Sequence, residues 1–433
     1  MPVLTEETLG LPLPSMLTAR QVFEAPRLAD AIGAVRTELN KPAIRQLLRP
    51  GQRIAVAVGS RGIHDIARLT RALIDGLKDA GAVPFIVPAM GSHGGATAEG
   101  QQRLLAGYGI SAETMGVPLI SSMETVMVGA TAGGIPIHLS KDALAADLIV
   151  AIARIKPHTD FRGPVESGLC KMLAIGLGKH VGCSRLHREG VACFDTLIPD
   201  VAARIIDRAP VGFGLAIIEN AYDETAHVEA VVASEFLTRE PALLVEAKRL
   251  MPRILFSEID VLVIKRIGKD VTGAGMDSNI VGRTTKGTLA EFSGPLIKRI
   301  VVLGLTEATA GNAIGIGLAD FTVKDILARI DHQATDANCI ASSDPEAGRI
   351  PIALTDEAEA TRAALSCTPG VDLQRARIVR IENTLDLKWI EFSEPLLDEA
   401  RREPRLVVES RQSMREGMSW SGPLGADRTA VVN

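Results

Sequence analysis

Histidines and lysines gather in one glycine-rich stretch of the chain. Residues 156–189 read KPHTDFRGPVESGLCKMLAIGLGKHVGCSRLHRE and directly follow the apolar run Asp147 to Ile155. Imidazoles and amines are side chains that can move protons, ligate metals or form covalent bonds near neutral pH. In α/β proteins, a buried strand often leads into a loop of this kind where the chemistry takes place. We therefore predict that the active site is organised around this stretch.

Two residues of this stretch are candidates for chemistry. Pro157 fixes the backbone directly before His158, and a histidine held in this way suits proton transfer. The alternative for His158 is a ring that only bonds the loop backbone. Lys171 lies in the mostly apolar run GLCKMLAIGLG. Its amine either reaches solvent or is desolvated as a nucleophile or covalent anchor, and the pattern leaves both open.

Two further histidines of the stretch could ligate a metal. His180 and His187 are seven residues apart, which places both on one face if the segment is helical. A histidine pair on one face is compatible with metal ligation. However, neither a carboxylate nor a third ligand follows at zinc spacing. We therefore do not expect a zinc site that is built by the protein alone.

A second glycine-rich loop carries another candidate histidine. Residues 90–95, MGSHGG, follow the β-rich run Val83 to Val87 and precede a helix that Thr97 could cap. Glycines and a helix N-terminus favour phosphate binding, but the loop matches neither the GxGxxG nor the Walker pattern. His93 is therefore either a solvated loop residue or part of the site.

These loops alternate with strands and helices. The strands are expected at Ile54 to Val58, Val83 to Val87 and Asp147 to Ile155, and the helices at Asp65 to Ala80 and after Thr97. Successive strand and helix units predict a parallel sheet with right-handed crossovers. Ligands collect at the carboxyl ends of such strands. Arg61, His93 and His158 each follow a strand, so we expect them to converge on one edge of the sheet.

The second half of the chain repeats the α/β pattern. We predict an N-terminal domain over residues 1–252 and a C-terminal α/β domain over residues 253–433, with Ile259 to Lys265 as its first strand. The loop Gly268 to Arg283 is too rich in glycine and polar residues for regular structure. The tail from Glu403 gives no clear signal. Other expected strands are Val117 to Ser121, Thr125 to Val128, Ile135 to Leu139, Phe213 to Ile218, Val228 to Ala233, Ile300 to Gly304, Ile350 to Leu354 and Arg377 to Ile381, and other expected helices are Ser234 to Leu250 with Pro241 interrupting it, Thr306 to Ala319, Val323 to Ile330 and Asp356 to Leu365.

Composition sets the fold class and excludes several partners. In 433 residues, hydrophobic residues make up 46% but aromatic residues only 3%, which favours two α/β domains with mainly parallel sheets. The net charge of −5 without basic clusters argues against nucleic acid. Five cysteines in no CxxC pattern indicate reduced thiols. Apolar runs are too short for a membrane span, so we expect a cytoplasmic protein.

Taken in order, these residues resemble the nickel-dependent lactate racemase family, whose members carry a nickel pincer nucleotide. Arg61 matches the family's arginine after the first strand, and His93 its first catalytic histidine. His158, preceded by proline as in the family, matches the second catalytic histidine. Lys171 matches the lysine that forms a thioamide with the cofactor. His187, sixteen residues later as in the family, matches the nickel ligand.

The resemblance implies a racemase or epimerase of a 2-hydroxy acid, with an active site in the cleft between the two domains. The protein would bind a small hydroxy acid and depend on cofactor biosynthesis proteins. His93 and His158 would be acid and base, Arg61 would clamp the carboxylate, and the cofactor would be covalent on Lys171. The interval from His158 to Lys171 is longer than in lactate racemases. The loop Gly268 to Arg283 also differs, which suggests another substrate, with Lys269 still supplying a positive charge.

Two alternatives remain open on the residues alone. One is a relative that lacks the nickel cofactor and uses the same histidines and lysine for another isomerase or lyase step. The other is a protein that binds an anionic metabolite or nucleotide without turning it over. An oligomer is possible in each case.

Overall fold

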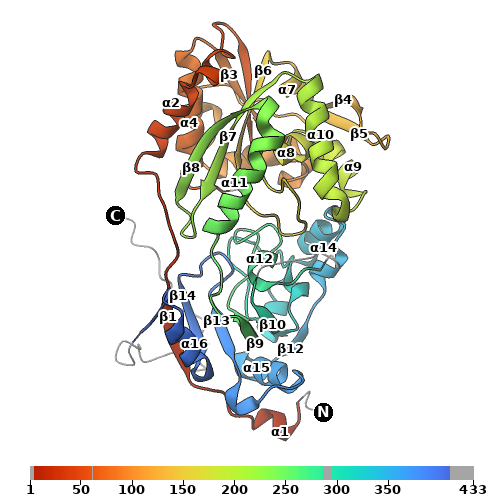
Figure 1. Ribbon diagram of the computed structural model, residues 1–433. Coiled ribbons are helices and arrows are strands. Elements are labelled where there is room, and N and C mark those ends of the chain that lie inside the picture. The colour runs from red at the N-terminus through yellow and green to blue at the C-terminus, as the bar shows by residue number, and fades with distance from the viewer. Residues whose placement is uncertain (1–3, 61, 286–293, 410–433) are drawn as a thin grey trace.

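The chain folds into two lobes, each built on one β-sheet with helices on its faces (Figure 1). The computed structural model describes residues 4–60, 62–285 and 294–409. The N-terminal lobe holds a five-stranded sheet in the order β3-β2-β6-β7-β8, and the second lobe an eight-stranded sheet in the order β12-β11-β10-β9-β13-β14-β1-β15. This confirms the predicted α/β class. None of the helices in the described part is both long and apolar enough to cross a membrane.

The elements have the following bounds. The strands are β1 (Met16–Gln21), β2 (Arg53–Val58), β3 (Val83–Pro88), β4 (Thr125–Ala130), β5 (Pro136–Ser140), β6 (Leu148–Arg154), β7 (Val211–Glu219), β8 (Thr225–Val232), β9 (Glu258–Ile264), β10 (Leu296–Val302), β11 (Phe321–Val323), β12 (Ile352–Leu354), β13 (Ile378–Ile381), β14 (Trp389–Ser393) and β15 (Leu406–Val408). The α-helices are α1 (Glu6–Leu9), α2 (Ala31–Leu39), α3 (Pro42–Arg45), α4 (Ile66–Asp79), α5 (Ala98–Gly107), α6 (Ala112–Met115), α7 (Lys141–Leu144), α8 (Leu169–Lys171), α9 (Lys179–His187), α10 (Phe194–Arg208), α11 (Phe236–Leu250), α12 (Ser278–Val281), α13 (Lys324–Leu327), α14 (His332–Ala341), α15 (Glu357–Ser366) and α16 (Leu397–Arg402).

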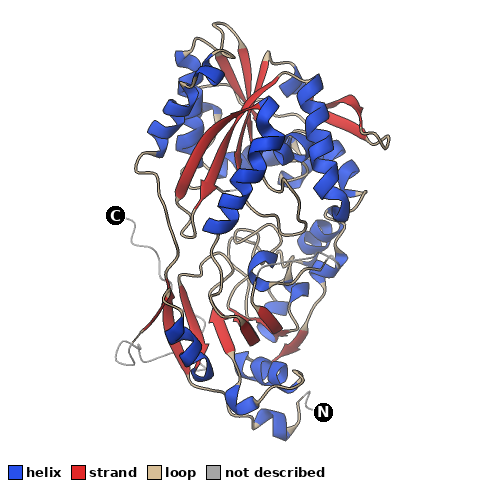
Figure 2. Cartoon of the chain, viewed as in Figure 1, coloured by secondary structure: helices blue, strands red, loops and turns tan. Residues whose placement is uncertain are grey.

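The N-terminal sheet is buried on both faces, as its apolar strands require. Along β2, Ile54, Val56 and Val58 face one core, which α2 and α4 cover. Ala55 and Ala57 face the opposite core, which α8, α10 and α11 cover. Figure 2 shows these helices in front of and behind the sheet. Strands β2, β3, β6 and β7 are parallel, and only β8 is antiparallel.

The strand order creates a switch point beside β2. The chain runs from β2 to β3 on one side and then crosses to β6 on the other side of β2. The loops that leave β2 and β6 therefore diverge at their carboxyl ends, which is where open α/β sheets bind ligands.

The first strand of the chain belongs to the C-terminal lobe. β1 pairs antiparallel with β14, where Thr18 lies opposite Glu391, and with β15 on its other edge. The assignment of the whole of residues 1–252 to one domain is thus wrong for this segment, because its alternating side chains complete the second sheet. The boundary near residue 253 stays a prediction.

A buried glutamine ties the two crossings between the lobes together. The Gln21 side chain is buried and donates to the carbonyl oxygens of Leu387 at 2.7 Å and Arg253 at 3.1 Å. Its amide oxygen accepts the backbone N–H of Leu255 at 2.9 Å. One side chain therefore joins the segment that enters the N-terminal lobe to the segment that leaves it.

Two expected elements are replaced by irregular structure. The expected helix over Thr306 to Ala319 is wrong, since Gly311 and Gly315 adopt φ of 79° and 93°, a left-handed conformation that ends a helix. A 3-10 turn covers only its end. The expected strand at Val117 to Ser121 is also wrong, because it makes only one isolated bridge, between Leu119 and Ile86.

Two other segments are more regular than expected. The loop from Gly268 to Arg283 contains the one-turn helix α12, which begins after the side chain of Asp277 caps it. Helix α11 runs through Pro241 without ending. Its buried face, which includes Leu243 and Leu244, compensates for the hydrogen bond that proline removes.

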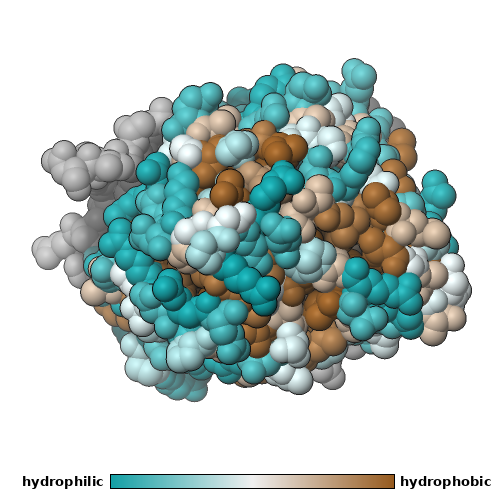
Figure 3. Space-filling view, turned by 90° about the horizontal axis from the view of Figure 1, so that it is seen from above, coloured by the Kyte–Doolittle hydropathy of each residue, from teal (hydrophilic) through white to brown (hydrophobic). Residues whose placement is uncertain are grey.

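Figure 3 shows the end of the N-terminal lobe that is turned away from the second lobe. Hydrophilic and hydrophobic residues are interspersed across it, and the apolar groups lie in several separate patches. This distribution is normal for a protein surface.

Candidate active site

His93 lies directly after β3 and reaches the loop that follows β2. Its Nδ1 is 2.5 Å from the hydroxyl oxygen of Ser60. A hydroxyl can donate or accept, so the His93 ring can take either neutral tautomer or the charged form beside it. The structure thus joins the first two loops at the carboxyl edge, as the strand pattern predicts.

The His93 loop is held in place by Gln101 on α5. The Gln101 side-chain amide donates to the carbonyl oxygens of Gly91 at 2.9 Å and His93 at 3.3 Å. Its oxygen faces the amine of Lys179 at 3.4 Å, and that amine donates to Pro88 at 2.6 Å. Burial lowers the pKa of Lys179 to about 8, although the charge of Asp142 opposes this. A buried cation therefore orients the amide that supports this loop.

The same loop packs on the stretch that follows Lys171. The N–H of Gly91 donates to the carbonyl of Gly176 at 3.1 Å. Gly91 has φ of 58°, and a Cβ there would lie 3.1 Å from the Cys183 sulfur. The chain around Gly176 forms a π-helix, Met172–Gly176, a geometry that is frequent at functional sites.

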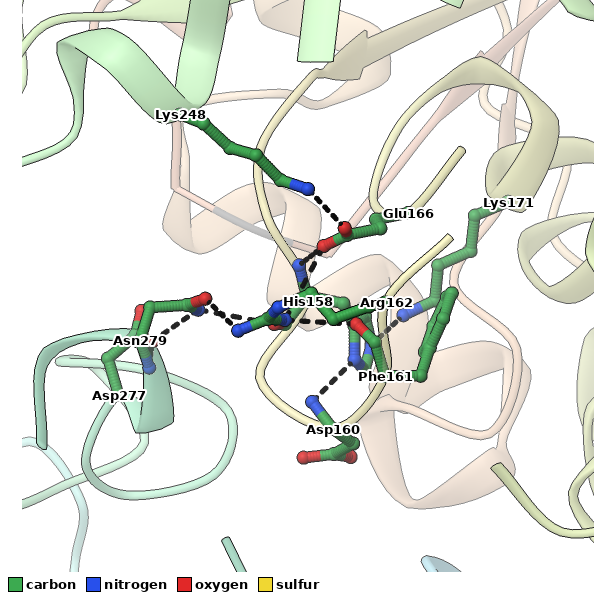
Figure 4. Close-up of polar contacts among 9 residues, drawn as sticks. All are labelled: His158, Asp160, Phe161, Arg162, Glu166, Lys171, Lys248, Asp277 and Asn279. Atoms are coloured by element: carbon green, nitrogen blue, oxygen red, sulfur yellow. Dashed lines mark hydrogen bonds and ion pairs between the residues drawn. The ribbon is translucent and has the colours of Figure 1, made fainter. Parts of the chain in front are cut away.

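His158 is fixed by its loop rather than by a rotatable hydroxyl. Its backbone N–H donates to the buried carboxylate of Glu166 at 2.6 Å, and the other Glu166 oxygen accepts from Lys248 at 2.6 Å. The His158 ring nitrogen Nδ1 accepts the backbone N–H of Asp160 at 3.0 Å. The ring also packs on Phe161, with centroids 4.6 Å apart. These contacts define both the position and the orientation of the imidazole (Figure 4).

Lys171 points at His158 (Figure 4). The Lys171 Nζ is in hydrogen-bonding contact with His158 Nε2, although thirteen positions separate the two residues. Lys171 ends the short helix α8, whose residues Leu169 and Cys170 are buried. The buried anchors hold the backbone while the lysine side chain leaves the core towards the imidazole.

A buried carboxyl lies behind the helix that carries Lys171. Glu240 of α11 accepts the backbone N–H of Cys170 at 2.9 Å, and its other oxygen has no partner among the described residues. Burial raises the pKa of Glu240 to about 7 against the effect of these backbone donors. Glu240 thus caps α8 without carrying a full negative charge at neutral pH.

The C-terminal lobe touches the His158 loop through α12. Asn279 donates to the carbonyl of His158 at 3.2 Å and accepts from Arg162 at 2.5 Å. Arg162 also donates to the His158 carbonyl at 2.7 Å, and burial lowers its pKa. The loop predicted to differ from lactate racemases therefore meets the site through Asn279. Lys269, predicted for substrate binding, instead contacts Asn338 on α14.

His187 ends α9 and is joined to His158 by a row of rings. Phe161 and Phe194 lie between them, with centroid distances of 5.4 Å for the phenylalanine pair and 5.2 Å from Phe194 to His187. His187 Nδ1 bonds the carbonyl of Cys183 at 2.8 Å, which directs Nε2 away from the helix. Burial favours a higher pKa for the Cys183 thiol, but hydrogen bonds from His187 and Ser92 bring it below the ordinary value.

The predicted residues are thus brought together in part. His158 and Lys171 are in contact, His93 lies on a neighbouring loop that packs on the same stretch, and His187 lies along the aromatic row. Arg61 lies outside the described residues. His180 is exposed, and its ring contacts the Ser184 hydroxyl at 3.3 Å.

Several residues of the site were missed by sequence reasoning. Glu166, Glu240, Gln101, Arg162 and Asn279 are polar residues in loops or helices whose spacing carries no signal. Their partners are backbone groups brought close by folding, as with Cys170 and Glu240, which are 70 positions apart. The sequence gives a hint only for Glu240, which interrupts the apolar face of α11.

Fold and site together define a two-domain α/β protein with basic side chains at the switch point of a parallel sheet. Residues 13–192 match the lactate racemase N-terminal domain. This match covers 180 of the 433 residues, so the N-terminal part of the chain is similar to lactate racemases, and a racemase-type function is supported at the level of that family. Within the described residues, three or more His, Cys, Asp or Glu side chains nowhere gather as a metal site.

Two solved structures are similar to the chain. The lactate racemase apoprotein from Thermoanaerobacterium thermosaccharolyticum is 14% identical with a TM-score of 0.46, and the match covers 84% of both chains. A protein from Thermotoga maritima is 14% identical with a TM-score of 0.50, over 79% of this chain and 92% of that one. At this identity the second likeness concerns the fold alone. No curated protein matches the sequence.

Proposed function

We propose that this protein is a racemase or epimerase of a 2-hydroxy acid that uses a nickel pincer nucleotide. The observation that carries the proposal is the contact between Lys171 and His158 at the carboxyl edge of a lactate racemase N-terminal domain. A lysine beside an imidazole combines a covalent anchor with a proton-transfer group. His93 and His187 complete the set on neighbouring elements.

The donor set fits this cofactor better than a free metal ion. A free ion needs several protein ligands, whereas the described residues hold no cluster of three or more candidate ligands. A nucleotide that brings its own sulfur and carbon donors requires one anchoring amine and one imidazole, for which Lys171 and His187 are suited. When bound, the cofactor supplies a ring carbon that can accept and return a hydride.

The two histidines would handle the hydroxyl proton. The α-hydrogen of a hydroxy acid is barely acidic, so removing it as a hydride avoids a carbanion and leaves only the hydroxyl proton to the protein. A planar keto acid can be reprotonated at oxygen from either side, which requires a proton-transfer group on each. His93 and His158 are these groups in the proposal, and Arg61 is the proposed clamp for the carboxylate.

The substrate is proposed to be a small 2-hydroxy acid, to which Lys269 would supply a positive charge. In the described structure the Lys269 amine contacts Asn338 on α14, and its backbone N–H donates to Thr309 at 3.2 Å. Its predicted role in substrate binding therefore remains a proposal that requires the lysine to leave Asn338. Cofactor biosynthesis proteins are the other proposed partners.

The test is to produce the chain together with cofactor biosynthesis enzymes. We expect a mass increase located on Lys171 by peptide mapping, bound nickel, and loss of optical activity of one 2-hydroxy acid in a screen. Lys171→Ala should lose the adduct and the activity. Lys141→Ala is the matched control, because Lys141 is exposed and forms a surface ion pair with Glu124 at 2.7 Å.

The lactate racemase from Thermoanaerobacterium thermosaccharolyticum, produced in the same cells, serves as a positive control. If that enzyme acquires the adduct and nickel while this chain acquires neither, the nickel proposal is wrong. A binding protein or a lyase without nickel would then be the better account. Turnover that persists in Lys171→Ala would separately exclude the covalent role.

A further inference from the structure

A buried carboxylate at the carboxyl edge of the N-terminal sheet has no role in the proposed reaction. Glu219 is the last residue of β7 and only 5% exposed. Its Oε2 forms an ion pair with Arg154, the last residue of β6. Its Oε1 accepts the backbone N–H of His64 at 2.5 Å, and His64 belongs to the loop that follows β2. One carboxylate therefore connects the carboxyl ends of three strands.

The hydrogen bond from His64 to Glu219 reaches across the sheet. Strand β6 lies between β2 and β7, so the bond spans the end of β6, where the chain leaves towards His158. The loop after β2, residues 59–65, is thereby kept over the switch point of the sheet. This is the place where open α/β sheets bind their ligands.

The two halves of this loop are held by different groups. At its start, the Ser60 carbonyl accepts the hydroxyl of Tyr108 at 2.8 Å, and the Ser60 hydroxyl contacts His93. At its end, the backbone N–H of His64 is held by Glu219. The first half is therefore fixed beside a proton-transfer group, and the second half is fixed by a different strand.

Arg61, the proposed clamp for the substrate carboxylate, follows Ser60 and precedes the half of the loop that Glu219 holds. We propose that Glu219 is a positioning residue for substrate binding, because it holds residues 62–65 and with them the clamp that precedes them. Tyr108 instead positions Ser60 for proton transfer. The inference rests on the proposed function, and it divides the loop into a part that sets KM and a part that sets kcat.

The role of Glu219 depends on both of its oxygens. A glutamine has only one acceptor oxygen, so it could accept from Arg154 or from His64 but not from both. The guanidinium is the charged and therefore stronger donor. Glu219→Gln should thus keep Arg154 and release His64. Adding Arg154→Met removes the competing donor and leaves the glutamine oxygen available to His64 again.

The first test measures KM and kcat for the hydroxy acid that the screen identifies, with protein produced together with cofactor biosynthesis enzymes. Glu219→Gln should raise KM by about tenfold and change kcat by less than about twofold, because it weakens binding and leaves proton transfer intact. The double variant Arg154→Met/Glu219→Gln should return KM to within about threefold of the wild type, since the acceptor for His64 is restored.

Two further variants show whether the effect is specific. Tyr108→Phe removes the hydroxyl that holds Ser60, so kcat should fall about two- to tenfold with KM little changed. Glu229→Gln is the matched control, because Glu229 is a carboxylate on the neighbouring strand β8 and is ion-paired with Arg239 at 2.6 Å. It should change neither constant. A rise in KM of the same size in Glu229→Gln would overturn the inference.

A second test needs neither cofactor nor substrate. Hydrogen exchange at the His64 amide should be at least about tenfold faster in Glu219→Gln than in the wild type and the double variant. Equal exchange in all three proteins would overturn the inference. If Glu219→Gln does not fold, an amide of His64 that exchanges in the wild type as fast as an unstructured amide would also overturn it.

The outcomes separate this inference from the proposed function. A wild type that carries the cofactor and turns over no hydroxy acid refutes the proposed function and with it the inference. Turnover with a KM that Glu219→Gln leaves unchanged refutes the inference alone. A raised KM, its return in the double variant and the opposite effect of Tyr108→Phe together would support it.

Discussion

The two histidine loops at the carboxyl edge of the N-terminal sheet are held in opposite ways. The loop after β3 is supported by a buried cation, Lys179, acting through Gln101, and its histidine faces the rotatable hydroxyl of Ser60. The loop after β6 is supported by the buried carboxylate of Glu166, and its histidine faces a fixed backbone N–H.

Because of this difference, the hydrogen bonding of the His93 ring can change, whereas that of the His158 ring is fixed by the backbone. His93 can exchange between tautomers because the Ser60 hydroxyl can reverse its hydrogen bond. His158 Nδ1 faces a backbone N–H whose direction is fixed, and its Nε2 contacts Lys171. We therefore expect His93 to adapt its hydrogen bonding during the proposed reaction and His158 to stay oriented towards Lys171.

Replacing the histidines tests this comparison most strongly. We expect His93→Asn and His158→Asn each to lower kcat for the hydroxy acid by about 10²- to 10⁴-fold, the usual contribution of an acid or base. Only His158→Asn should also lower the yield of adduct on Lys171. Intact mass and polarimetry on the same preparations give both values. An equal loss of adduct in both variants would show that the two loops do not differ in this way.

The buried carboxyl behind Lys171 should make the chain less stable as the pH rises towards neutrality. The pKa of Glu240 is raised by burial from 4.5 to about 7, so the folded chain binds this proton more tightly than the unfolded chain. The free energy of unfolding contributed by Glu240 therefore falls as pH rises from about 4.5 to 7, by on the order of 3 kcal/mol. In urea titrations, the free energy of unfolding of the wild type should fall between about pH 4.5 and 7 relative to that of Glu240→Gln.

Lys179 provides the matched variant on the β3 side, with the opposite sign. Its pKa is lowered by burial from 10.5 to about 8, so the unfolded chain binds the proton more tightly. Relative to Lys179→Met, the wild type should gain stability as pH rises from about 8 to 10.5. The difference in free energy of unfolding between wild type and variant should change with pH for both Glu240→Gln and Lys179→Met. If it did not, the side chains of Glu240 and Lys179 would be solvated in the folded chain.

The smallest expected effect concerns the hydroxyl beside His93. Ser60→Ala removes one neutral hydrogen bond, which is worth about 0.5–1.5 kcal/mol. We expect kcat to fall about two- to tenfold and the pH profile of kcat to shift, with KM little changed. Ser92→Ala is a suitable control. Ser92 is on the same loop as His93, but its hydroxyl contacts Cys183 at 3.7 Å. An equal effect of both changes would argue against a specific role for Ser60.

The sequence predicted those parts that depend on local pattern. Strands such as β2 and β6 are apolar runs bounded by turns, and the Thr97 hydroxyl caps α5 as expected, accepting from Gly100 at 3.0 Å. The meeting of the loops after β2 and β3 followed from parallel strands alone. His158 and Lys171 were both found as candidates, but no spacing rule could predict that they touch.

The parts that could not be predicted depend on distant partners. β1 has an alternating pattern that would fit either sheet, and only its pairing with β14 and β15 decides between them. Glu166 and Asn279 act through backbone groups of the His158 loop. Such contacts exist only once the fold has formed. They cannot be predicted from the sequence, because nearly every residue has the same backbone donor and acceptor.

The placement of β1 also has a consequence for how the protein is made. Its neighbours in the sheet, β14 and β15, are among the last described strands of the chain. The pairing of Thr18 with Glu391 can therefore form only after Glu391 has left the ribosome. Contacts between such distant residues form late and slowly. The N-terminal sheet contains every strand from β2 to β8 except β4 and β5, which pair with each other, so it can assemble during synthesis. An unpaired β1 must be kept from aggregating until β14 and β15 have been made.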